Sequence, residues 1–249
     1  LKNCAVAVSD WCRLKRLQLN AKKTECMYFG SAINLQKIPD HMKRFSVGNE
    51  TVEPVSVVRN LGVLFDEHLN MKAHISNISR TCFFHLRRFR SFRHHLGREI
   101  TQQLVSAFVL SRLDNAVLAG LPDATLAPLQ RVLNASARLI LDLRPRDHVT
   151  PALKELHWLP IRQRIEFKLC LLVYLSLHAI YATFVSDHPG RASLHSAQTR
   201  NLDDPRTRLR KRALQVAGPT AWNKLPKDIK CATTTALFKC LKRNLKRSY

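Results

Sequence analysis

The pattern of hydrophobic and polar positions changes in character near Leu69. Before this point the chain has short apolar runs bounded by glycine or proline, which predict strands at 24–30, 52–58 and 61–65. Pro54 interrupts the second run and moves it to a sheet edge, because proline has no N–H for a central ladder. The segment 3–18 predicts a helix, whereas 31–50 has no periodicity and predicts a variable loop.

From Leu69 onward, apolar residues recur at spacings of three and four, which is the period of an amphipathic helix. Helices are predicted at 70–96, 99–119, 125–143, 150–158, 161–179 and 232–247. The second of these is expected to bury Leu104, Phe108 and Ser111. The third is expected to bury Leu126, Leu129, Leu133, Ala137 and Ile140. The fold class is therefore mainly α with a small N-terminal β portion (α+β), which is followed by a largely helical body.

The composition allows a hydrophobic core, since 45% of the 249 residues are hydrophobic, and it excludes a disordered basic tail. The longest uncharged apolar stretch, 169–185, covers 17 positions and includes His178. A spanning helix needs about 20 apolar residues, so this stretch is interpreted as a buried helix and no membrane partner is expected. The alternative, a membrane-associated helical protein, depends on this stretch alone.

The charge of the chain is strongly unbalanced, because 41 lysines and arginines against 18 aspartates and glutamates give a formal charge of +23. Residues 71–98 contain 7 basic and no acidic residues, and residues 206–249 contain 13 basic residues and 1 acidic residue. A solvated surface normally mixes both signs. These two blocks therefore predict binding faces for a polyanion, which is most often nucleic acid.

The basic side chains of the two blocks are the candidate nucleic-acid contacts. They are Arg80, Arg87, Arg88, Arg90, Arg93 and Arg98 in the first block, and Arg206, Arg208, Arg210, Lys211, Arg212, Lys239, Lys242, Arg243, Lys246 and Arg247 in the second. The first block also contains Phe83, Phe84, Phe89 and Phe92. These rings either stack on bases or face the core, and their helical spacing favours the core. The cluster 206–212 also has the composition of a nuclear import signal.

Two acidic pairs are candidate metal ligands, and a structural role explains both better. Asp203–Asp204 is followed by proline and arginines, which predicts a solvated loop and not the rigid turn that holds metal ions in nucleotidyl transferases. Asp66–Glu67 ends an apolar run, where Asp66 or Asn70 is expected to cap the next helix. The seven cysteines have no ligand spacing, so no metal site is predicted.

Several segments, read in order, resemble the reverse transcriptases of non-LTR (LINE-type) retrotransposons. The segment after the catalytic aspartate pair of that family is similar to SDWCRLKRLQLNAKKTECMYFGS. Its continuation, a Leu-Gly-Val strand of the primer grip and then the first thumb helix, resembles VRNLGVLFDEHLNMKAHISNISRTCFFHLR. Chicken-repeat and jockey-like elements show the order of the later segments LVSAFVLSRLDNAVLAGLP, LQRVLNASARLI, DHVTPALKELHWLPIRQRIEFKLCLLVY and VAGPTAWNKLP.

This resemblance implies an RNA-directed DNA polymerase that uses Mg²⁺ and copies element RNA at a nicked chromosomal site. It assigns 1–68 to the end of the palm, 69–145 to the thumb and 146–249 to a basic C-terminal extension. Lys23 matches an accessory lysine near the incoming nucleotide, and the primer grip is matched by Leu61, Gly62 and Val63. The implied partners are element RNA and RNA–DNA or DNA duplexes. The implied location is the nucleus, with a cytoplasmic ribonucleoprotein phase.

The chain departs from this family in its catalytic motif. The aromatic-x-Asp-Asp sequence is absent from the 249 residues and is expected upstream of Leu1. Without metal-binding aspartates the chain alone is predicted to be inactive as a polymerase and to hold no cofactor. Asn115–Ala116 replaces the usual Tyr-Cys of the family, which suggests a drifted copy. The alternative is a non-enzymatic, domesticated nucleic-acid-binding protein.

Overall fold

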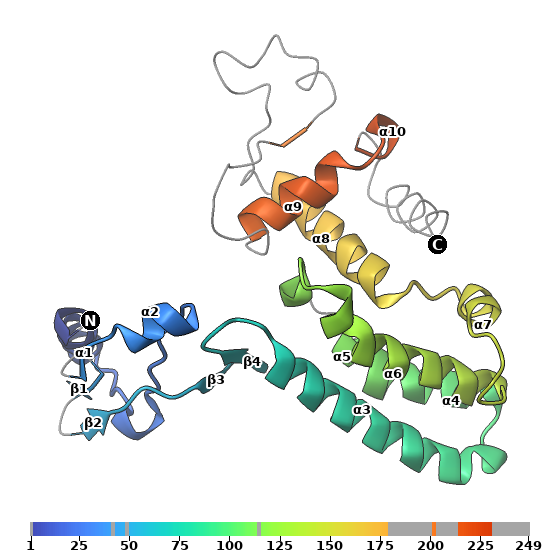
Figure 1. Ribbon diagram of the computed structural model, residues 1–249, viewed down its shortest axis with the longest axis horizontal. Helices are drawn as coiled ribbons and strands as arrows, with labels where there is room; N and C mark the ends of the chain where they lie inside the picture. Colours follow the sequence, from blue (N-terminus) through green and yellow to red (C-terminus); the bar gives the residue numbers. More distant parts are fainter. Residues whose placement is uncertain are drawn as a thin grey trace. The chain divides into compact units, whose positions relative to one another are not determined.

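The named strands of this chain all precede Met71, and helices build the rest of the described residues (Figure 1). The structure is a computed structural model that describes residues 2–40, 43–47, 50–113, 116–178, 201–202 and 214–230. Contacts divide the chain into two compact units, Leu1–His74 and Ile75–Tyr249. The expected fold class, mainly helical with a small N-terminal β portion, is confirmed at this level.

The first unit combines short helices with two separate β-hairpins. Its elements are α1 (Lys2–Leu14), the 3₁₀ turn η1 (Ala21–Lys23), α2 (Ala32–Gln36), β1 (Phe45–Val47), β2 (Glu50–Val52), β3 (Val57–Asn60) and β4 (Val63–Asp66). Strand β1 pairs antiparallel with β2, and β3 pairs antiparallel with β4. The turn between β3 and β4 is Leu61–Gly62, and both residues have positive φ angles, 47° and 84°. Two consecutive positive φ angles are what a two-residue hairpin turn of type I′ requires.

Three expectations for the first unit are wrong. The run 52–58 is not one strand, because β2 ends at Val52 and β3 begins at Val57. The segment 24–30 is not a strand, because only Cys26 forms a bridge, to Pro54. Proline lacks the N–H that would continue the ladder, so the pairing stops after Val55 N–H donates to the Cys26 carbonyl at 2.9 Å. The segment 31–50 is not a plain loop, since it contains α2, whose N-terminus is capped by the Ser31 hydroxyl.

The second unit is built from helices. Its elements are α3 (Lys72–Phe92, which begins in the first unit), the 3₁₀ turn η3 (Arg93–His95), α4 (Arg98–Val105), the π-helix η4 (Ser106–Leu110), α5 (Ser111–Leu113), the 3₁₀ turn η5 (Ala116–Leu118), α6 (Asp123–Leu141), α7 (Thr150–Glu155), α8 (Ile161–His178), α9 (Leu214–Asn223) and α10 (Lys227–Lys230). Helix α6 packs against α4, α7 and α8, and α8 packs against α9 (Figure 1). The stripe expected on α6 is confirmed, because all five of its residues are buried.

The stripe expected on 99–119 is wrong, because Phe108 and Ser111 are exposed. In α4 and η4 the buried residues are instead Thr101, Val105, Val109 and Leu110. Thr101, Val105 and Val109 recur at a spacing of four, which is wider than the period of an α-helix, and the π-helical turn spans 106–110. This wider turn rotates the later side chains out of the phase that an α-helical reading assigns to them.

Helix α8 places its C-terminal half in a cluster with α9. The cluster contains Cys170, Val173, Tyr174, Leu202, Trp222 and Ile229. The cluster buries Cys170, Val173 and Tyr174 of the apolar stretch 169–185, whereas Leu175 is 51% exposed. Among the described residues no helix has the length and apolarity to cross a membrane. The helix expected at 232–247 lies outside the described residues.

Candidate nucleic-acid interface

A turn built around the Asp66 carboxylate starts the helix that carries the first basic block. Asp66 Oδ1 accepts the N–H groups of His68 and Asn70 at 3.2 and 2.9 Å, and its Oδ2 accepts that of Met71 at 2.7 Å. The Asn70 side chain then accepts the N–H of Lys72, the first residue of α3, at 2.9 Å. The capping turn expected at Asp66 is therefore confirmed. Its carboxylate is almost buried and is fully engaged in shaping the backbone.

Helix α3 presents arginines to solvent along its outer side. Arg80, Arg87, Arg88 and Arg90 are all exposed. The helix contains no aspartate or glutamate, so nothing within it neutralises these cations. Arg80 and Arg87 are seven residues apart and so lie on one stripe, about 10 Å apart along the axis. We call the side chains of Arg80, Arg87, Arg88 and Arg90 the arginine face.

The other two arginines of the first block are tied to neighbouring elements. Arg93 forms an ion pair with Asp142 at the end of α6, and its Nη2 donates to the Ile140 carbonyl at 3.5 Å. Arg98 Nη2 donates to Glu155 Oε1 of α7 at 2.5 Å. Only 20% of the Arg93 side chain is exposed. These two cations hold the two ends of the α3–α4 connection to the helices beside them.

The pairing with Arg93 changes the pKa of the Asp142 carboxyl group. The hydrogen bond and the charge of Arg93 lower the pKa of Asp142 below its ordinary value of 3.8, and the charges of His94 and Arg90 act in the same direction. Asp142 also ends α6 with a left-handed backbone, φ 54° and ψ 40°. Helix α6 therefore stops at Leu141, before Pro145, and the terminating residue supplies the partner of Arg93.

Aromatic rings on α3 and η4 gather into one cluster, which we call the aromatic cluster: Phe84, His85, Phe89, Phe92 and Phe108. The His85 ring centroid lies 5.5 Å from that of Phe84 and 5.2 Å from that of Phe108. The Phe89 ring lies 5.9 Å from both Phe92 and Phe108. The core position expected for these rings is confirmed for Phe89, which is buried. It is wrong for Phe84 and Phe92, which are 48% and 36% exposed.

Two cationic groups flank this cluster. The Arg88 guanidinium lies over the Phe84 ring, 5.7 Å from its centroid. Arg112 Nε donates to the Phe108 carbonyl at 3.1 Å. Sequence reasoning missed both Phe108 and Arg112, because it placed Phe108 in the core stripe and Arg112 lies outside the two basic blocks. The signal available in the sequence is their spacing of four residues, which places both on one side of a helix.

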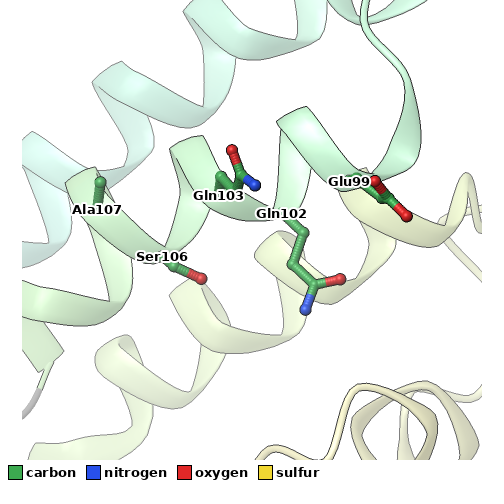
Figure 2. A pocket seen from close by; sticks show the side chains of 5 residues that line it. All are labelled: Glu99, Gln102, Gln103, Ser106 and Ala107. Carbon is green, nitrogen blue, oxygen red and sulfur yellow. The ribbon is translucent and has the colours of Figure 1, made fainter.

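An open groove with a volume of about 600 Å³ lies beside α4 and the start of η4 (Figure 2). Its lining residues are Glu99, Gln102, Gln103, Ser106 and Ala107. Figure 2 shows the Gln102 and Gln103 side chains pointing to different sides of the helix. The groove offers amide and hydroxyl groups that donate and accept hydrogen bonds, beside one carboxylate.

The residues that the family resemblance singles out lie in the first unit. Lys23 is exposed in η1, where its N–H donates to Asn20 Oδ1 at 3.2 Å while the Thr24 hydroxyl donates to the Asn20 carbonyl at 3.0 Å. Leu61 and Gly62 form the turn of the β3–β4 hairpin, and only Val63 belongs to a strand. The expected Leu-Gly-Val strand is thus a hairpin tip. Leu61 stands at this tip, 98% exposed.

The remaining candidates lie outside the described residues. These are the basic residues at 206–212 and 239–247, Asp203–Asp204 and Asn115. Within the described ranges no group of three or more histidine, cysteine, aspartate or glutamate side chains is arranged to hold a metal ion. The described part of the interface therefore consists of the arginine face and the aromatic cluster.

Comparisons with protein-family models, curated proteins and solved structures found no significant match to this chain. The functional argument accordingly rests on the residues themselves and on their arrangement in the described part of the chain.

Proposed function

We propose that this chain binds the sugar–phosphate backbone of nucleic acid, and that it is the template–primer-binding part of an RNA-directed DNA polymerase of the non-LTR type. The observation that carries the proposal is the arginine face of α3, with exposed arginines on a helix that has no acidic residue. Guanidinium groups bind phosphate oxygens through charged, often bidentate hydrogen bonds. Contacts of this kind position a duplex and carry little sequence information.

One further feature supports the polymerase part of the proposal. The β3–β4 hairpin with Leu61 at its tip comes directly before the long basic helix α3. This is the order in which the resemblance expects a primer grip and then a thumb helix. The partners proposed on this basis are RNA and RNA–DNA or DNA duplexes, including element RNA, and the location proposed is nuclear with a cytoplasmic ribonucleoprotein phase.

The chain by itself is expected to bind without polymerising, because the 249 residues contain no aromatic-x-Asp-Asp motif. Phosphoryl transfer in such polymerases depends on metal ions held by these carboxylates. Mg²⁺ would supply that chemistry in the intact parent enzyme. The alternative function, a non-enzymatic domesticated nucleic-acid-binding protein, is favoured by the same missing motif and predicts the same binding. An intact upstream reading frame that encodes the motif would support the polymerase.

The binding proposal is tested by the salt dependence of affinity for an RNA–DNA duplex, measured by fluorescence anisotropy. A slope of about −0.9 per phosphate contact lowers the affinity about 3.5-fold per contact when salt rises fourfold. Replacing two arginines of the face, Arg80→Gln with Arg87→Gln, should make the slope less steep by about 1.8. The matched control is Arg13→Gln with Arg162→Gln, which removes the same charge from exposed arginines already paired with Asp10 and Asp123.

The control pair should leave the slope within error of the parent chain. An affinity that does not change with salt, or equal slopes for the two double variants, overturns the proposal. A circular dichroism spectrum of each variant shows that the helices remain formed.

A further inference from the structure

Three rings of the aromatic cluster are exposed, whereas Phe89 is buried. Phe84 and Phe92 lie on α3, and Phe108, which is 43% exposed, lies on the π-helix η4. The rings meet around His85, whose centroid is within 5.5 Å of those of Phe84 and Phe108. The Phe84 and Phe108 rings are inclined to that of His85 by 72° and 40°, so they form an apolar surface of tilted rings, which water solvates poorly.

The π-helical turn explains why Phe108 belongs to this surface. An α-helical continuation of α4 would place Phe108 in the stripe with Leu104, which is half-buried. The π-turn instead buries Val109 and leaves Phe108 outside, with its ring 5.2 Å from that of His85. π-turns are uncommon and recur at functional sites. Here the π-turn adds the Phe108 ring to the exposed surface.

The charges around the cluster favour an anionic ligand. The Arg88 guanidinium stacks over Phe84, and Arg112 is anchored to the Phe108 carbonyl. The next stripe of α3 carries Arg80 and Arg87, and no acidic side chain lies on this helix. A ligand that matches these features carries flat aromatic groups along a chain of negative charges. Single-stranded nucleic acid has this chemistry, whereas a duplex hides the faces of its bases.

We propose that the aromatic cluster is a stacking platform for the unpaired bases of single-stranded nucleic acid, with Arg88 and Arg112 beside it as contacts for the strand. The inference rests on the proposed backbone binding. It adds a preference for strands with unpaired bases, which contacts to phosphates alone do not give. Phe84 and Phe108 receive base faces, because both rings are exposed and both border His85. Every base has such a face, so the platform tolerates any sequence.

The test compares the full chain on two labelled single strands of about 15 nucleotides, oligothymidylate and an abasic strand of the same length. The two strands carry the same phosphates and differ only in the bases. The parent chain should bind oligothymidylate at least about tenfold more tightly, which one or two stacked bases are enough to produce. Phe84→Leu with Phe108→Leu should lower this ratio about tenfold and leave the abasic affinity unchanged, because leucine keeps the apolar volume and removes the ring.

The matched control is Phe29→Leu, at a phenylalanine of the first unit that is 49% exposed, and its ratio should equal that of the parent. Arg88→Lys keeps the charge and loses the planar group over Phe84, so it should lower the ratio. Equal parental affinity for the two strands overturns the platform, as does a double variant that keeps the parental ratio. Failure of both strands and the duplex to bind at low salt overturns the proposed function itself.

Discussion

The side-chain amide of Asn223 pairs with the backbone of Leu202 in both directions. The Leu202 N–H donates to Asn223 Oδ1 at 2.8 Å, and Asn223 Nδ2 donates to the Leu202 carbonyl at 3.0 Å. Lys230 completes the arrangement, since its Nζ donates to Asn201 Oδ1 at 2.6 Å and to the Asn223 carbonyl at 3.2 Å. The Asn223 side chain thus pairs with both backbone groups of Leu202, as the backbone of a neighbouring β-strand would. These bonds hold residues 201–202 against the end of α9.

Removing this amide should destabilise the second unit. Asn223→Ala leaves the N–H and the carbonyl of Leu202 without these partners, and we expect a loss of about 1–3 kcal/mol in the free energy of unfolding. Buried Trp158 and Trp222 report the transition by fluorescence in urea. Lys224→Ala, at the next and exposed position, should change stability by less than about 0.5 kcal/mol. Equal effects of the two variants would contradict the role given to Asn223.

The ion pair between Arg93 and Asp142 should make stability depend on pH in the acid range. Because Arg93 lowers the pKa of Asp142 below 3.8, the pair stabilises the fold above that pH, and this contribution is lost as the pH falls through the lowered pKa. Asp142→Asn removes the charge and tolerates the left-handed backbone. The variant should therefore melt at a lower temperature than the parent at neutral pH, with a gap that closes in acid. A gap of the same size at every pH would show that the charge is irrelevant.

The buried His74 predicts a second pH effect, in the first unit. Burial lowers the pKa of His74 below 6.5, and its Nδ1 accepts the N–H of Leu64 at 3.4 Å. Stability from the neutral ring is complete above pH 6.5 and is lost as the pH falls below it, because the unfolded chain then binds a proton that the folded chain resists. Hydrogen exchange of the Leu64 amide should speed up in acid relative to its intrinsic rate. The Val55 amide, bonded to the Cys26 carbonyl, is the internal control.

In a His74→Asn variant the side-chain oxygen does not titrate in this range. The protection of the Leu64 amide in that variant should be independent of pH. A pH-dependent protection that persists in the variant would assign the effect to another group.

A substitution at the tip of the β3–β4 hairpin should raise stability and weaken binding at the same time. Leu61 adopts a φ of 47°, which asparagine accepts more readily than leucine, and Asn-Gly is the preferred pair for this turn. Leu61→Asn should therefore raise the free energy of unfolding by about 0.5–1 kcal/mol. If the exposed leucine contacts the primer end, as proposed, the same variant should bind an RNA–DNA duplex more weakly. A variant that is more stable and binds equally well would leave Leu61 with no part in binding.

At Gly62 the backbone alone should decide the effect of a substitution. A Cβ built on Gly62 meets no atom within 4 Å, but its φ is 84°. Gly62→Ala should therefore cost about 1–2 kcal/mol through the left-handed backbone, with no steric clash. Chemical denaturation measures this loss, and Gly97→Ala, where φ is negative and the space is open, is the matched control. A Gly62→Ala variant as stable as the parent would contradict the turn geometry.

The local periodicity of the sequence predicts the long helices and the buried face of α6. The five residues expected on that face are all buried, because an α-helix of fixed period presents every third or fourth side chain to the same neighbour. The turn at Asp66 was also predictable, since a carboxylate before a helix accepts N–H groups only a few residues away. Both features depend on residues close together in the chain.

The sequence by itself determined that this protein is mainly helical and carries concentrated positive charge. Only the tertiary structure decided which charges are available: Arg93 and Arg98 are held by Asp142 and Glu155, which lie far along the chain, whereas Arg80 and Arg87 remain exposed. It likewise decided that Phe108 stands on the surface, because the π-turn shifts the phase of its helix. Ion pairs and helix phase depend on partners and packing that a local pattern of residues does not encode.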